Sequence, residues 1–314
     1  MSSIVNSATY WRSQSILAMK EYSNSTPQKP LQYPGVFNVY EGDPDRKFFQ
    51  YLSLVGFGTL FVRGEGQAPH IDSPSEGNLS YFVYTTFALA YRVTKEMMRE
   101  DAKSIIPKLP GLLRYSSDQT KERIFWNVFN YAFSSAVQLA DGQPLCSAAH
   151  PLKGASSQPG VNSYSNYLGA APFTVESLQS AFLLMSTIPD DRGLLTSRTP
   201  MKVVYPPGMH QVVQEVLNSG YYPSTDENRI NAVAGSIDYM PTDYITSNPT
   251  GPFPWFVLAA KGEPGQDSHT IFQSVKWDEQ RAFPDPVTQS MTHETEFRAS
   301  WGAVDGRGVV GSLG

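Results

Sequence analysis

Cys146 and His150 are the residues whose types and spacing most resemble a catalytic pair. They lie four positions apart and follow Asp141, and a thiol, an imidazole and a carboxylate are the groups that a cysteine hydrolase combines. No helix is expected to begin directly after Cys146, so nothing in the pattern lowers the pKa of its thiol. His150 precedes Pro151, which favours a role in a turn. We therefore predict no catalytic residue, and the loop at 142–172 stays open as the site of an alternative protein, a soluble hydrolase or ligand-binding protein.

The other residues that could bind a metal or a cofactor stand apart from one another. The remaining histidines show no spacing of the HExxH kind: His70, His210, His269 and His293. Gly56 and Gly58 lie within a strand pattern with no helix after them, unlike a dinucleotide-binding loop. The aspartates that could suggest a metal fit polar turns better: Asp43, Asp45 and Asp72. The sequence thus predicts no metal site and no cofactor.

Composition sets further bounds on the function. The chain has 314 residues and a formal net charge of −5, whereas a protein that binds nucleic acid generally through its phosphates would be basic. A single cysteine excludes an internal disulfide and a cysteine-based structural zinc site. We find no apolar run of about 18 residues and no basic region followed by an apolar core at the N-terminus, so we expect no membrane span and no signal peptide.

The candidate pair follows the longest helical pattern of the chain, at 116–141. Ser116 is a suitable N-cap and Asp141-Gly142 a suitable end, because glycine adopts the left-handed conformation without a steric penalty. One broad face is apolar, with Phe125, Phe129 and Phe133 as its expected core residues. A helix of about seven turns is long for a globular domain, so it needs a large partner surface.

The N-terminal part predicts an arm and a projecting hairpin. Residues 1–37 combine large apolar side chains with many serines and prolines, so we expect an arm that lies on another surface or, alternatively, a disordered terminus. Two runs rich in strand formers, at 48–62 and 78–94, predict a long β-hairpin with a polar tip near 63–77. Proteins rarely leave such an edge exposed, so we expect another chain to cover it, unless it folds as a meander on its own core.

The rest of the chain predicts a lobe and a return to strands. Residues 142–262 alternate helices, at 173–188 and 209–217, with short strands, which is typical of an α/β unit. The end of the chain reads as strands at 270–277 and 294–304, followed by a turn and two valines.

The order of these elements, with three motifs, resembles a known family. The motifs are TxEM at 94–97, DGxPLxSxxHP at 141–151 and FRxSWGxxDxRGVxGS at 297–312. Together they resemble the major capsid proteins of tailed bacteriophages, close to the Mu-like major head subunit family. The resemblance covers about residues 37–314, and it rests on the order and spacing of motifs of which none is highly specific.

The resemblance implies the α+β fold of tailed-phage major capsid proteins, which herpesvirus floor domains share. It divides the chain into the N-terminal arm (1–37), the arm end and extended loop (38–83), the peripheral domain with its spine helix (84–141), the axial domain (142–262) and the C-terminal strands of the peripheral domain (263–314). It also implies a structural protein, not an enzyme, that forms hexamers and pentamers of an icosahedral head around double-stranded DNA. It further implies that the long helix lies across a long sheet built from residues 81–94 and the two C-terminal strands. Such a protein is made in the host bacterial cytoplasm and resides in the virion.

The resemblance also implies partners and contact residues. The arm is too short and too poor in charge for the scaffolding segment of many relatives, so either the scaffold is a separate protein or this is a mature form. A maturation protease, a portal and packaged DNA bound without sequence specificity are the other implied partners, and no membrane is. The residues expected to contact neighbouring subunits are Phe57, Phe61, Arg63, Glu65, Trp11 and Tyr33.

Overall fold

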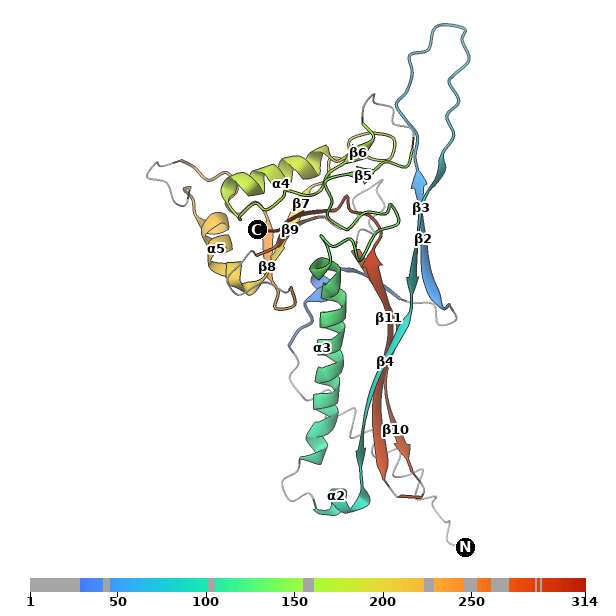
Figure 1. Cartoon of the computed structure of the whole chain (residues 1–314), viewed down its shortest axis with the longest axis vertical. Coiled ribbons are helices and arrows are strands. Elements are labelled where there is room, and N and C mark those ends of the chain that lie inside the picture. The colour runs from blue at the N-terminus through green and yellow to red at the C-terminus, as the bar shows by residue number, and fades with distance from the viewer. Residues whose placement is uncertain are drawn as a thin grey trace.

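Two four-stranded sheets organise the part of the chain that the structure describes. This computed structural model describes residues 29–41, 46–100, 105–154, 161–222, 229–245, 253–260, 271–285, 287–288 and 290–314. Figure 1 shows a long sheet with a helix along it, a lobe near one end of that helix, and a hairpin that projects past the lobe. This mixture of helices and sheets agrees with the expected α+β class.

The long sheet has the strand order β1-β10-β11-β4. Its strands are β1 (Asn38–Glu41), β4 (Thr85–Val93), β10 (Ile271–Pro284) and β11 (Met291–Ala303). β11 pairs antiparallel with both β10 and β4, so Phe297 lies opposite Phe87 and the two rings stack with centroids 5.1 Å apart. The predicted pairing of two C-terminal strands with the strand that follows the hairpin is confirmed, and β1 adds a parallel edge strand beside β10.

The long helix α3 spans Leu109–Asn130, so its predicted limits of 116–141 are wrong at both ends. It begins earlier because Pro110 lies in its first turn, where the missing proline N–H costs nothing. It ends earlier because the backbone bonds change partner: the N–H of Ala132 donates to Phe129, and the carbonyl of Ala132 accepts from Cys146 at 2.8 Å. Gly142, with φ +80°, closes a later turn and does not end the helix.

The core forms where α3 meets the long sheet and the lobe. Phe125 is fully buried and Phe129 is 2% exposed, whereas Phe133 is partly buried at the edge of the same cluster. Phe129 and Phe133 both pack on Phe256 of the lobe, with ring centroids 5.0 Å and 5.5 Å away. Phe133 lies beyond the end of α3 and not on the helix as predicted, and it packs with Phe129 on the lobe. Phe125 instead meets Trp301 of the long sheet, with ring centroids 6.1 Å apart.

The lobe is built on the second sheet, which has the order β12-β9-β7-β8. Its elements are α4 (Val175–Thr187), β7 (Pro200–Tyr205), α5 (His210–Asn218), β8 (Asp238–Pro241), β9 (Trp255–Ala259) and β12 (Val309–Ser312), beside a small pair of strands, β5 (His150–Pro151) and β6 (Ser163–Tyr164). Thr174 caps α4 in a reciprocal pair with Ser177. The two last valines lie in β12, which pairs with β9, so the chain ends in the lobe sheet and not in the long sheet beside β11.

The hairpin consists of β2 (Phe48–Val55), β3 (Ser75–Val83) and the tip, residues 56–74, which contains no strand. The two strands pair antiparallel, as predicted, but the tip is longer than 63–77 because β2 ends at Val55. The predicted continuous strand at 78–94 divides at Tyr84: β3 belongs to the hairpin and β4 to the long sheet. The remaining short helices are α2 (Lys95–Glu100), η1 (Tyr33–Gly35), η2 (Ile106–Lys108) and η3 (Pro207–Met209).

Candidate assembly surface

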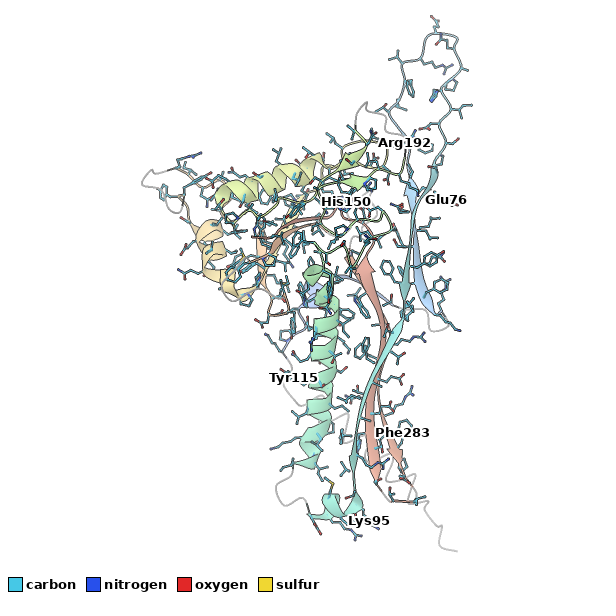
Figure 2. All side chains as sticks on the ribbon, viewed as in Figure 1. Glu76, Lys95, Tyr115, His150, Arg192 and Phe283 are labelled. Carbon is cyan, nitrogen blue, oxygen red and sulfur yellow. The ribbon has the colours of Figure 1, made fainter. Side chains whose placement is uncertain are left out.

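Large apolar side chains of the hairpin are exposed. In the tip, Leu60 and Val62 are fully exposed and Ile71 is 85% exposed. Exposed apolar side chains continue along the two strands: Phe48, Leu52, Leu54, Leu79, Tyr81 and Val83. Figure 2 shows the side chains of the tip standing clear of the rest of the molecule. A contiguous apolar surface of this kind marks a site of interaction with another molecule.

The local sequence explains why the hairpin forms and projects. Ser53 sits at an irregularity in the strand register, and its Oγ accepts the N–H of Asn78 at 2.7 Å. A Cβ at Gly77 would lie 2.2 Å from that Oγ, so only glycine allows the strands to approach there. Asp72 then ties the two sides of the tip together by accepting the N–H groups of Gly58 and Ser73.

Four of the predicted contact residues gather in the tip. Phe57 is 58% exposed and Phe61 is 66% exposed, and the side chains of Arg63 and Glu65 are exposed as well. The ring of Phe61 meets the edge of His70 at a centroid distance of 4.5 Å. The sequence pattern did not point to Leu60 or Val62, although both are more exposed than the two phenylalanines.

Tyr33 is a correction to the predicted contact set. It is 7% exposed, and its ring packs edge-on against Phe125 with centroids 4.7 Å apart, so it belongs to the core of its own chain. Phe37 is fully buried beside it, among the rings of Phe125, Trp126 and Phe129. The end of the predicted arm therefore lies on its own α3. Trp11 lies outside the described residues.

The alternative site around Cys146 has the geometry of a structural network. His150 is fully buried, its Nδ1 lies 2.6 Å from Asp141 Oδ2, and its Nε2 lies 3.1 Å from Asn166 Oδ1. Asn166 also donates to the carbonyls of Leu145 and Gly306. The sequence missed Asn166, because an isolated asparagine in a loop carries no pattern. Together these bonds fasten the loop after α3 to the end of the chain.

The thiol of Cys146 is not a reactive group in this arrangement. Cys146 is 3% exposed, and burial raises the pKa of its thiol well above the ordinary range. A catalytic cysteine instead needs a thiolate, which a lowered pKa and partial exposure provide. Its Sγ fills space beside Gly311, where an added Cβ would lie 2.7 Å away. Cys146 thus acts as a small apolar side chain.

The described residues offer neither a metal site nor a membrane-spanning helix. Within those ranges, no three His, Cys, Asp or Glu side chains gather as metal ligands do. No described helix has the length and apolar character needed to cross a membrane. The exposed apolar side chains of the hairpin therefore form the candidate site for contact with another molecule.

Comparison with protein families identifies the chain. The family model described as "Phage capsid protein" matches residues 81–313, which is well over half of the sequence. The chain belongs to this family. It is a phage capsid protein, a structural component of the phage head shell, and its place is the virion. The narrower relation to Mu-like head subunits and the link to herpesvirus floors stay predictions.

Solved structures show the same fold at low sequence identity. A chain of the mature capsid of bacteriophage PhiM1 is 10% identical, with a TM-score of 0.61 over 92% of this capsid protein and 88% of that chain. A chain of the capsid of cyanophage P-SCSP1u is 9% identical, with a TM-score of 0.60 over 92% and 89%. A chain of the decorated capsid of bacteriophage JBD30 is 12% identical, with a TM-score of 0.55 over 72% and 95%. None of the curated proteins compared with the sequence matches it.

Proposed function

We propose that this capsid protein assembles into hexamers and pentamers of an icosahedral shell, and that the hairpin makes the contact between neighbouring subunits. The observation that carries the proposal is the row of exposed apolar side chains on the tip, above all Leu60 and Val62. Water disfavours such a surface by roughly 25 cal/mol for each Å² of apolar area. A neighbouring subunit that covers the hairpin removes this penalty.

The two sheets suit two parts of a shell subunit. We assign the long sheet with α3 to the peripheral domain and the lobe to the axial domain, near the centre of each capsomer. The shared core between Phe129 and Phe256 supports a subunit in which the two domains move as one body. A separate scaffolding protein, a maturation protease, a portal and packaged double-stranded DNA are the partners that this role requires.

The role is structural and not catalytic. The strongest argument is Cys146, the residue on which a hydrolase hypothesis depends, because its thiol is buried and burial raises its pKa. His150 has both ring nitrogens occupied by Asp141 and Asn166. Neither residue is accessible to a substrate.

Two paired substitutions test the contact role of the tip. Leu60→Asp with Val62→Asp places charges on two side chains that are fully exposed in the subunit, so folding is unaffected. We expect this variant to remain soluble and folded by circular dichroism and to form no shells in electron micrographs. The matched control, Leu60→Met with Val62→Ile, keeps the apolar character and assembles. Normal particles from the aspartate variant would contradict the proposal.

A further inference from the structure

Among the described residues, an ion pair joins the tip of the hairpin to the lobe. Arg192 Nη2 lies 2.6 Å from Asp72 Oδ2, and the two side chains are 18% and 28% exposed. Asp72 is also the residue that accepts the N–H groups of Gly58 and Ser73 from the two sides of the tip. The pKa of Asp72 is lowered, first by the Gly58 N–H and also by Arg192, so its carboxylate is charged at neutral pH. A single carboxylate thus links both sides of the tip to the lobe.

The lobe presents Arg192 from a tightly closed turn. Asp190 Oδ1 accepts the N–H groups of Arg192 and Leu194 at 2.8 Å and 2.7 Å, and Gly193 supplies the left-handed residue with φ +81°. The next residue, Asp191, is held by Arg307 at 2.7 Å in a largely buried ion pair. These bonds therefore hold in place the backbone that carries the Arg192 side chain.

The base of the hairpin is a second attachment point. The ring of Phe82 lies directly on Gly302 of β11, where an added Cβ would be 2.2 Å from the ring. Tyr84, the one residue between β3 and β4, is 6% exposed and lies beneath the guanidinium of Arg298 at 5.8 Å from its ring centroid. These contacts fix the base of the hairpin and do not reach its tip.

Between the base and the ion pair, the hairpin and the lobe are not packed continuously. A polar cavity of about 190 Å³ separates them, lined by Ser53 and Asn78 from the hairpin and by Arg198 and Asp305 from the lobe. Next to it, Val55 packs on Gly154, where an added Cβ would lie 2.8 Å from Val55 Cγ1. Among the described residues, the Asp72–Arg192 pair therefore lies on the tip side of this cavity and restrains the hairpin beyond it.

We propose that the Asp72–Arg192 pair is a clamp that holds the hairpin in one direction in the unassembled subunit. The idea rests on the proposed function, because its use is to present the tip ready for a neighbour. A contact segment that is ordered in advance loses less conformational entropy on binding, so association is favoured. A partly exposed ion pair is weakened by salt, so high ionic strength should release the clamp.

A distance measurement on unassembled protein tests the clamp. Spin labels on Glu65→Cys in the tip and Gln179→Cys on α4 report the direction of the hairpin, while Cys146 is buried and unavailable for labelling. We expect one narrow distance distribution at low salt. Arg192→Gln and Asp72→Asn should each replace it with a broad one, and Arg192→Lys, which keeps the charge, should retain most of the narrow distribution.

Two controls make the result specific. Arg281→Gln removes a different surface ion pair, with Glu296 at 3.7 Å in the long sheet, and should leave the distribution narrow. The double variant of Asp72→Asn and Arg192→Gln should be no broader than either single variant, because both remove the same interaction. An unchanged distribution in Arg192→Gln, or effects that add in the double variant, would overturn the clamp. These outcomes do not depend on assembly, so they are distinguishable from failure of the tip as a contact surface.

Discussion

Glu122 brings a carboxylate into the core, 2% exposed, where an unpaired charge is costly. Its Oε1 accepts the backbone N–H groups of Gln32 and Tyr33, and its Oε2 accepts the indole N–H of Trp126 at 2.7 Å. Burial raises the pKa of Glu122, and the three hydrogen bonds oppose this shift without cancelling it. Glu122 therefore anchors the chain before β1 to α3 with a strength that depends on its protonation.

This shift has a defined sign in the dependence of stability on pH. Because the pKa of Glu122 is raised above its ordinary value of 4.5, the folded protein binds the proton more tightly than the unfolded chain. The stabilising contribution is fully present below the unfolded pKa and is lost as pH rises through the folded pKa. We predict that the Tm of the wild type minus that of Glu122→Gln increases as pH falls from 7 towards the ordinary pKa and levels off below it.

Thermal unfolding at a series of pH values measures this difference. Glu176→Gln is the matched control, because it makes the same substitution at an exposed position on α4. A Glu122→Gln difference that shrinks on acidification would mean that the hydrogen bonds dominate over burial.

Phe129 is the second prediction at the scale of single residues. Its ring packs on Phe256, Trp126 and Phe37 with centroids 5.0 Å, 5.4 Å and 6.0 Å away. Phe129→Ala should therefore destabilise the subunit by about 3–5 kcal/mol, as a large truncation in a core. Phe283→Ala, at a position 41% exposed, should have a much smaller effect. Denaturant unfolding measures both, and an unchanged midpoint for Phe129→Ala would show that this cluster is not the core.

Sequence periodicity predicted the burial of some of these residues and missed the burial of others. Helical spacing puts Phe125 and Phe129 on one face, and both are buried. The same reasoning assigns charged residues to solvent, so it missed Glu122 and Lys121. Their burial depends on partners distant in sequence: backbone groups near Tyr33 for Glu122, and the ring of Phe297, 5.3 Å from the Lys121 Nζ.

At the scale of elements, the packing of the Phe82 ring against Gly302 joins the hairpin to the long sheet. A methyl group at Gly302 would displace the ring, since the added Cβ would lie 2.2 Å from it. We predict that Gly302→Ala loosens the base of the hairpin. Hydrogen exchange should then become faster in β3 and stay unchanged in β9. Gly56→Ala is the control, because nothing lies within 4 Å of its added Cβ. Equal hydrogen exchange in the two variants would argue against an anchoring role for the contact between Phe82 and Gly302.

Element types were easier to predict than element ends. Alternation and helical spacing identified the hairpin, α3 and α4, since each is set by local pattern. The end of α3 was not predictable, because it depends on the bond from Cys146 to the carbonyl of Ala132. The break at Tyr84 was also hidden, because one alternating run supplies strands to two different sheets.

At the scale of the whole molecule, the net charge of −5 bears on how strongly the protein binds duplex DNA. Duplex binding draws mainly on cationic side chains that displace counterions from phosphates. We predict weak binding of unassembled protein to duplex DNA at about 0.15 M salt, measured by fluorescence anisotropy. Tight binding with a steep salt dependence would contradict this and point to a local basic lining.

The topology of the long sheet also governs when a newly made chain can fold. β1, at residues 38–41, pairs with residues 272–275, and β4 pairs with β11 at residues 291–299. Ribosomes add roughly 5–20 residues per second, so these partners emerge well apart in time. Until β11 has been synthesised, the Phe82 ring cannot pack against Gly302, and the base of the hairpin is not attached to the long sheet. With the role proposed for the hairpin, we expect an interrupted chain to lack a usable contact segment, so that the connectivity itself keeps incomplete subunits out of the shell.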